Sequence, residues 1–98
     1  MTPILQITGD LIFSTVPQWR RVGRCHILES EQPIIDLQRI TRCDCSAVAL
    51  LLAWLRDAKE RGKVVRFAHC PTQLRDIAAV YGTLSVLQTG IDNAHTDH

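Results

Sequence analysis

Short apolar runs separated by a turn signal open the chain. Residues 4–7 (Ile-Leu-Gln-Ile) and 11–13 (Leu-Ile-Phe) each have the length and composition of a strand. Gly9-Asp10 lies between them and is typical of a tight turn. The pattern therefore predicts an antiparallel hairpin at the N-terminus.

Helical spacing of apolar residues follows the predicted hairpin. Ser14 or Thr15 can cap a helix that runs to about Leu28, with Pro17 in its first turn. Gly23 weakens this helix by roughly 1 kcal/mol relative to alanine. The spacing predicts an inner face formed by Val16, Trp19, Val22 and His26.

Two further strands flank a second helix. Residues 34–37 are apolar or nearly so on both faces, as expected of a central parallel strand. A helix is predicted from Ser46 to Arg61, ending at Gly62, which is a common residue just after a helix. Residues 64–68 then have the composition of the next strand.

The C-terminal part predicts one more helix and one more strand. The helix starts at Pro71, ends at Gly82, and repeats its apolar positions at Leu74, Ile77, Ala78 and Tyr81. Residues 84–87 predict a short strand, and 88–98 a flexible tail. The order β-β-α-β-α-β-α-β predicts an α/β fold: one domain over 1–87, with a small mixed sheet formed by the hairpin and then parallel strands, and helices packed on it.

Composition narrows the class of protein. The chain has 98 residues, of which 46% are hydrophobic and 21% charged, which fits one globular domain. A formal net charge of +1 argues against broad nucleic-acid binding. The N-terminus lacks a secretory signal pattern, and the longest helical apolar run is far shorter than the ~20 residues of a membrane span. We therefore expect a cytoplasmic protein whose four cysteines are reduced.

The richest chemistry lies in the turn before the second helix. Asp44 is expected to cap the helix or to stabilise its positive end. Cys45 is expected to be a small, partly buried thiol. Three roles stay open for Ser46: a helix cap, a partner contact and a phosphorylation site.

Neither a metal site nor an active site is predicted. Cys43, Cys45, His69 and Cys70 lie at strand ends on one edge of the sheet, but their spacing differs from that of zinc-binding cysteine pairs. Adjacent residues of a strand also point in opposite directions, which separates His69 from Cys70. The chain has no glycine-rich phosphate loop and no nucleophile with an evident histidine–acid partner, so we expect neither an enzyme nor a cofactor.

The second helix has an unusually wide apolar surface. At about 100° per residue its apolar arc spans about 200°, more than one sheet face normally covers. Either another helix covers the excess, or the excess forms a docking face centred on Leu50 and Trp54.

Several segments resemble a STAS domain, the fold of sulfate transporters and anti-sigma-factor antagonists. They are the strand end Asp36-Leu37, the turn Asp44-Cys45-Ser46-Ala47, the helix end Lys59–Lys63 and the helix start Gln73-Leu74. The resemblance covers residues 5–87. Within the family the chain is most similar to the stand-alone STAS subunits of Mla-type phospholipid transporters, because of its Leu50–Leu52 run and its Ala79–Gly82 helix end.

This resemblance implies a non-catalytic cytoplasmic subunit, peripheral to the inner membrane. Such a subunit binds the ATPase of an ABC transporter, and indirectly a permease and a periplasmic lipid-binding subunit, in a system that maintains outer-membrane lipid asymmetry. Cys45 stands where Mla subunits typically have Thr, and Ala47 where the family turn usually has Gly. The alternative is an anti-sigma-factor antagonist phosphorylated at Ser46. The expected partner-binding residues are Asp44, Cys45, Ser46, Ala47, Leu50 and Trp54.

Overall fold

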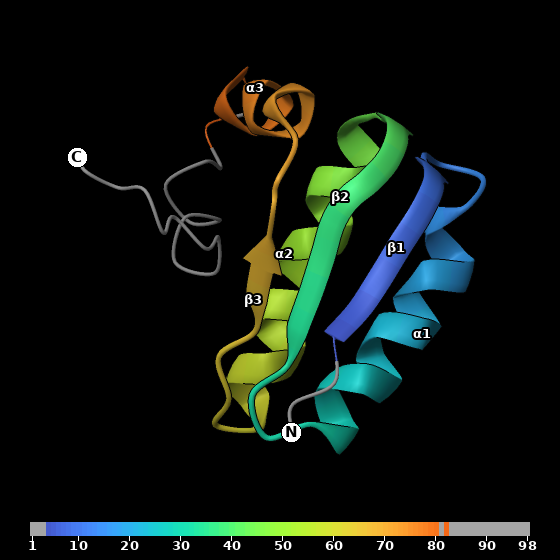
Figure 1. Ribbon diagram of the computed structural model, residues 1–98. Coiled ribbons are helices and arrows are strands. Elements are labelled where there is room, and N and C mark those ends of the chain that lie inside the picture. Colours follow the sequence, from blue (N-terminus) through green and yellow to red (C-terminus); the bar gives the residue numbers. More distant parts are fainter. Residues whose placement is uncertain (1–3, 81, 83–98) are drawn as a thin grey trace.

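Strands and helices alternate along the chain in a computed structural model that describes residues 4–80 and 82 (Figure 1). The elements are β1 (Ile4–Leu11), α1 (Val16–Glu29), β2 (Ile34–Cys43), α2 (Cys45–Glu60), β3 (Arg66–Ala68) and α3 (Thr72–Val80). The described sheet has the order β1-β2-β3, and both strand pairs are parallel. The predicted α/β class is confirmed, as is the central position of the strand that begins at Ile34.

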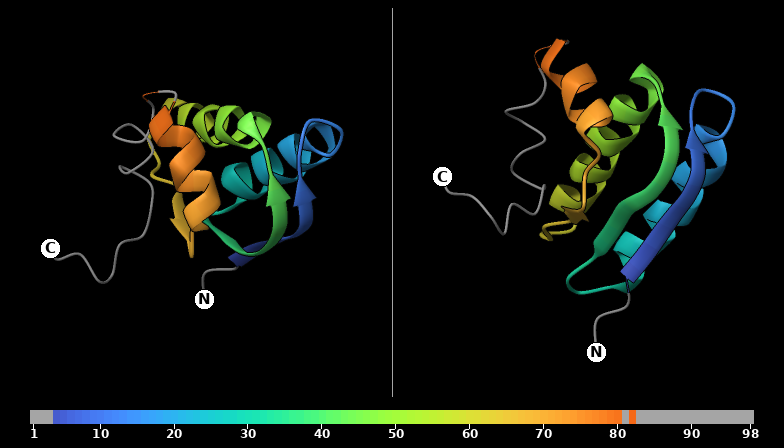
Figure 2. Two further views of the ribbon diagram at one scale, coloured as in Figure 1. Left: turned by 90° about the horizontal axis from the view of Figure 1, so that it is seen from above. Right: turned by 45° about the horizontal axis from the view of Figure 1, so that its top comes forward.

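The two long helices lie on one face of this sheet. Helices α1 and α2 pack side by side behind β1 and β2, and α3 packs against α2 beyond the end of β3 (Figures 1 and 2). The core between the layers includes Ile35 and Leu37 of β2, Phe67 of β3, and Leu51 and Trp54 of α2. Among the described residues, no helix is both long enough and apolar enough to cross a membrane.

The predicted N-terminal hairpin is wrong, because β1 is one continuous strand of eight residues. Gly9 has φ +83°, a conformation that favours glycine, but the chain continues in the same direction past it. The β1–β2 register shifts near this point, between Gly9 and Asp10 and also between Gln6 and Thr8. The Gly9-Asp10 signal therefore marks an irregularity in a parallel ladder rather than a chain reversal.

Strand β2 continues well beyond the predicted end at Leu37. Gln38, Arg39 and Thr41 are exposed and Ile40 is half-buried, so the second half of the strand lacks a continuous apolar signal. Its backbone still pairs with β1 as far as Cys43. In contrast, β3 is shorter than predicted, because the assigned strand begins only at Arg66.

The buried face of α1 matches the predicted one in part, because Val16 and Trp19 pack against the core and His26 is half-buried. Val22 is exposed, while Gly23 and Ile27 are buried. An added Cβ at Gly23 would lie 2.2 Å from ring atoms of Trp54, so the absence of a side chain at this glycine lets the Trp54 ring of α2 pack directly on α1. The prediction missed Gly23 because a glycine carries no apolar signal. Thr15 occupies the N-cap position without a side-chain cap bond, so the predicted hydroxyl cap is wrong.

The C-terminal ends of α2 and α3 follow the sequence signals. Gly62 has φ +69° and its N–H donates to the Lys59 carbonyl at 3.0 Å, which confirms its predicted role after α2. Gly82 likewise has φ +70° and donates to Ala79 at 3.1 Å. The predicted strand 84–87 and tail 88–98 lie outside the described residues.

His26 provides a pH-dependent prediction. Desolvation by burial lowers its pKa, which outweighs the opposing effects of its contact with the Ile34 carbonyl and of nearby Glu29. The folded state therefore binds fewer protons than the unfolded state between the lowered pKa and about 6.5, so stability should rise with pH across that window. Denaturant unfolding from pH 5 to 8 should give a smaller rise in the His26→Gln variant. An NMR-measured pKa of His26 at or above about 6.5 would contradict the prediction.

Candidate partner-binding surface

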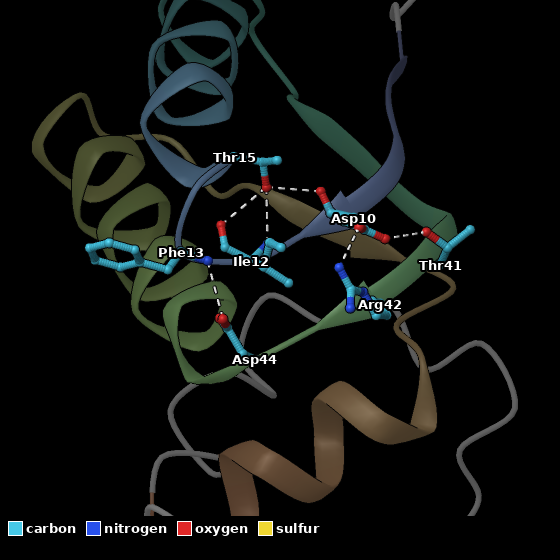
Figure 3. Close-up of polar contacts among 7 residues, drawn as sticks. All are labelled: Asp10, Ile12, Phe13, Thr15, Thr41, Arg42 and Asp44. Atoms are coloured by element: carbon cyan, nitrogen blue, oxygen red, sulfur yellow. Dashed lines mark hydrogen bonds and ion pairs between the residues drawn. The ribbon is translucent and has the colours of Figure 1, made fainter.

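Asp44 joins two segments that meet at the carboxyl ends of the first two strands. Its Oδ1 accepts from the Ser46 N–H at 2.8 Å and caps α2. Its Oδ2 accepts from the Phe13 N–H at 3.1 Å and so holds the loop between β1 and α1 against the start of α2 (Figure 3). The predicted cap at Asp44 is confirmed, and Ser46 is not the cap residue.

The loop between β1 and α1 is also fixed from inside. The Thr15 hydroxyl accepts from the Ile12 N–H at 3.0 Å and lies 2.9 Å from the Asp10 carbonyl oxygen (Figure 3). The Asp10 carboxylate accepts from Arg42 and from the Thr41 hydroxyl, each at 2.8 Å. These bonds lower the pKa of Asp10, and the bond from Arg42 has the largest effect. The position of the loop is therefore set by both strands and by α2.

This loop presents Phe13 to solvent, with 81% of the residue exposed. A groove with a volume of about 410 Å³ runs from Phe13 between the two long helices. We call it the α1–α2 groove, and its exposed or half-buried lining consists of Phe13, Val16, Pro17, Arg20, Ser46, Ala49 and Ala53. Cys45, the first residue of α2, is exposed next to Ser46, so the prediction that its thiol is partly buried is wrong. An aromatic side chain beside an apolar groove is a typical anchor of a protein interface.

The predicted site residues divide into two groups. Asp44 and Ser46 are half-buried and Cys45 is exposed at the edge of the α1–α2 groove. Ala47 and Trp54 are fully buried, and Leu50 is only 2% exposed. A partner-binding role for Asp44, Cys45 and Ser46 remains a prediction.

Of the two residues at the centre of the predicted docking face, Trp54 is covered by α1, whereas Leu50 lines the α1–α2 groove with 2% of the residue exposed. The Trp54 ring packs against Gly23, and its Nε1–H donates to the Arg20 carbonyl at 3.4 Å. The Arg20 guanidinium forms an ion pair with Asp57 across the same pair of helices. The alternative interpretation of the wide apolar arc, that a neighbouring helix covers the excess, therefore applies to Trp54.

Sequence reasoning missed Phe13, which lines the groove with 81% of the residue exposed. It was assigned to the second strand of a hairpin, where an apolar side chain needs no further explanation. The available signal was the position of Phe13 just before Ser14 and Thr15. A large aromatic residue in the loop that precedes a helix is not needed to complete a strand.

The cysteines near the ends of β2 and β3 have poorly reactive environments. Burial raises the pKa of Cys70 to about 11, and it also raises the pKa of Cys43. Both groups are therefore protonated thiols with little nucleophilic thiolate at neutral pH. His69 Nδ1 lies 3.3 Å from an oxygen of Asp36. Within residues 4–80 and 82, no three His, Cys, Asp or Glu side chains form a group that could hold a metal ion.

A family model described as "Mlab, STAS domain" matches residues 1–88. The chain belongs to the STAS domain family. The match includes the whole described structure, and therefore both the α1–α2 groove and the capped start of α2. No curated protein matches the chain.

Solved STAS structures share this fold at low sequence identity. A sulfate transporter family protein from Wolinella succinogenes aligns with a TM-score of 0.72 and 16% identity, covering 93% of this chain and 79% of that one. The anti-sigma factor antagonist SpoIIAA, in its unphosphorylated form, gives 0.61 and 20%, covering 76% and 69%. The STAS domain of a SulP transporter from Vibrio cholerae gives 0.62 and 13%, covering 90% and 70%. The STAS fold predicted from the sequence is thus confirmed.

Proposed function

We propose that this chain is a non-catalytic MlaB-type subunit that binds the ATPase subunit of an ABC-type phospholipid transporter. In this proposal it is cytoplasmic and reaches the inner membrane through its partner. The permease and the periplasmic lipid-binding subunit are indirect partners in a system that maintains outer-membrane lipid asymmetry. The description of the matching family model favours this branch of the STAS family.

The exposure of Phe13 at a fixed position is the observation that supports the proposal most. Exposed phenylalanines on flexible loops lose conformational entropy when they bind, but Asp44 already holds this loop on α2. Cys45 and Ser46 extend the same surface over the start of α2. We expect an apolar side chain of the ATPase to enter the α1–α2 groove. Neighbouring residues of the ATPase should contact Cys45 at the edge of the groove.

The proposed mechanism is thermodynamic linkage rather than chemistry on a substrate. A subunit that binds the assembled, active ATPase more tightly than other forms shifts the population toward that state. The size of the shift is limited by the ratio of the two affinities. The groove lies between two packed helices, so it can bind a partner without a large rearrangement of its own backbone.

Phe13→Glu is expected to weaken binding to the purified ATPase at least tenfold, because it places a charge at the proposed apolar anchor. Cys45→Arg should also weaken binding by adding a bulky cation at the rim. Binding constants can be measured by biolayer interferometry, with circular dichroism as the test of folding. Val80→Glu on α3 is a matched control, since Val80 is also 81% exposed.

The control should bind as tightly as the parent. If folded Phe13→Glu and Cys45→Arg also bind like the parent, this surface is not the ATPase contact. Equal weakening by Val80→Glu would show that any added surface charge has the same effect, which would also contradict the proposal.

Regulation of an anti-sigma factor through phosphorylation of Ser46 stays a prediction. The Ser46 side chain is half-buried in the α1–α2 groove, and Asp44 already accepts from the Ser46 N–H. A phosphate here would lie near the positive end of α2 but also beside the Asp44 carboxylate, which repels it. Mass spectrometry of the protein from its native host should therefore find Ser46 unmodified. A substantial phosphorylated fraction would favour the signalling function.

A further inference from the structure

A second groove lies along another flank of α2, beside the start of β3. Its volume is about 670 Å³, and we call it the α2–β3 groove. Its floor is apolar: Leu52 and Leu55 are half-buried and Val65 is fully buried. Val64, at the edge of the groove, is 62% exposed. This surface shares no lining residue with the α1–α2 groove, so its role does not depend on the function proposed above.

Three cations line the α2–β3 groove, and its lining contains no acidic residue. Arg56 and Lys59 come from successive turns of α2, and neither forms an ion pair within the described part of the chain. Lys63 is held in place because its Nζ donates to the carbonyls of Ile27 at 2.8 Å and Leu28 at 3.0 Å. The groove therefore combines an apolar floor with a positive rim whose Arg56 and Lys59 form no ion pair among the described residues.

We propose that the α2–β3 groove binds an amphipathic acidic segment of a second protein. Apolar side chains of that segment would cover Leu52, Leu55 and Val64, and its carboxylates would pair with Arg56 and Lys59. Residues three apart on a helix lie about 5–6 Å apart at Cβ, so a helix with Asp or Glu at a spacing of three or four matches this rim. The charge pairs set the orientation and the choice of partner, while burial of the floor supplies affinity.

The recessed floor favours a protein segment over a membrane surface. Val65 has no exposed area, and Leu52 and Leu55 are exposed only in part. A flat bilayer would reach Val64 and the cations but not the floor between them. A helix, by contrast, can insert side chains from one face into the groove.

Two synthetic helical peptides test the proposal. They share leucines at positions i, i+3, i+4 and i+7, and differ in carrying glutamates or lysines beside the leucines. Added to the full isotope-labelled chain, the glutamate peptide should shift the amide resonances of Leu52, Leu55 and Val64. The double variant Arg56→Glu/Lys59→Glu should bind it at least about tenfold more weakly and should bind the lysine peptide instead, because both charge pairs are reversed.

Arg21→Glu/Arg24→Glu on α1 is the matched control, since it changes the net charge equally at exposed arginines elsewhere. It should leave binding of the glutamate peptide unchanged. Equal affinity for both peptides would overturn the proposal, as would resonance shifts that cluster away from the groove. Binding of neither peptide would also overturn it. Vesicles containing phosphatidylglycerol that bind through Arg56 and Lys59, without peptide binding, would assign the groove to membranes.

Discussion

Replacing Gly23 by alanine is expected to destabilise the protein by about 3 kcal/mol or more, at the upper end of overpacking effects. The added methyl carbon would lie 2.2 Å from two carbons of the Trp54 ring, far inside van der Waals contact. That ring has no exposed area, so it has little free space into which it can move. Equilibrium unfolding in urea, followed by circular dichroism, measures the change.

The sign of this effect distinguishes packing from helix propensity. In a helix interior without tertiary contacts, glycine to alanine stabilises by about 1 kcal/mol. Combining Gly23→Ala with Trp54→Leu removes the ring, so the alanine should then be neutral or stabilising relative to Trp54→Leu alone. A Gly23→Ala variant as stable as the parent would mean that α1 and α2 do not approach as closely as described here.

Much of the fold could be predicted because local signals and the tertiary structure agree. Gly62 follows α2 in a left-handed conformation, which glycine adopts readily at the end of a helix. Asp44 caps the start of that helix, as its short carboxylate predicts. The prediction for the N-terminal segment was wrong because there the local signal and the tertiary structure disagree. Gly9-Asp10 is an ordinary hairpin signal, and only pairing with β2, about thirty residues away in sequence, keeps the strand straight.

The candidate site was predicted only in part, since sequence periodicity cannot tell which neighbour covers an apolar face. Trp54 has the pattern of an interface anchor, yet α1 buries it, and the signal for that contact is the absent side chain of Gly23. Phe13 shows the reverse case. It has the pattern of a strand residue, but the bond from its N–H to Asp44 holds it in an exposed loop.

Trp54→Ala is expected to lower the free energy of unfolding by about 3–5 kcal/mol, the range for removing a large buried aromatic side chain. Domains of this size are stable by about 5–15 kcal/mol, so the variant should be near the limit of folding. Trp19, which is only half-buried on α1, provides the matched control, and Trp19→Ala should cost clearly less. Chemical unfolding of both variants by circular dichroism makes the comparison. Similar losses at the two positions would contradict the packing described for α2.

This expectation changes how binding experiments on the second helix should be interpreted. A Trp54→Ala variant that no longer binds a partner would be explained by loss of the α1–α2 contact, because the ring offers no surface to a partner. Trp54→Phe keeps most of the apolar volume and gives up only the long 3.4 Å bond to the Arg20 carbonyl, so it should stay folded. If Trp54→Phe retains full stability yet loses partner binding, then the indole contacts the partner and the burial described for Trp54 is contradicted. If it retains both, the contact is made by exposed residues such as Phe13 and Cys45.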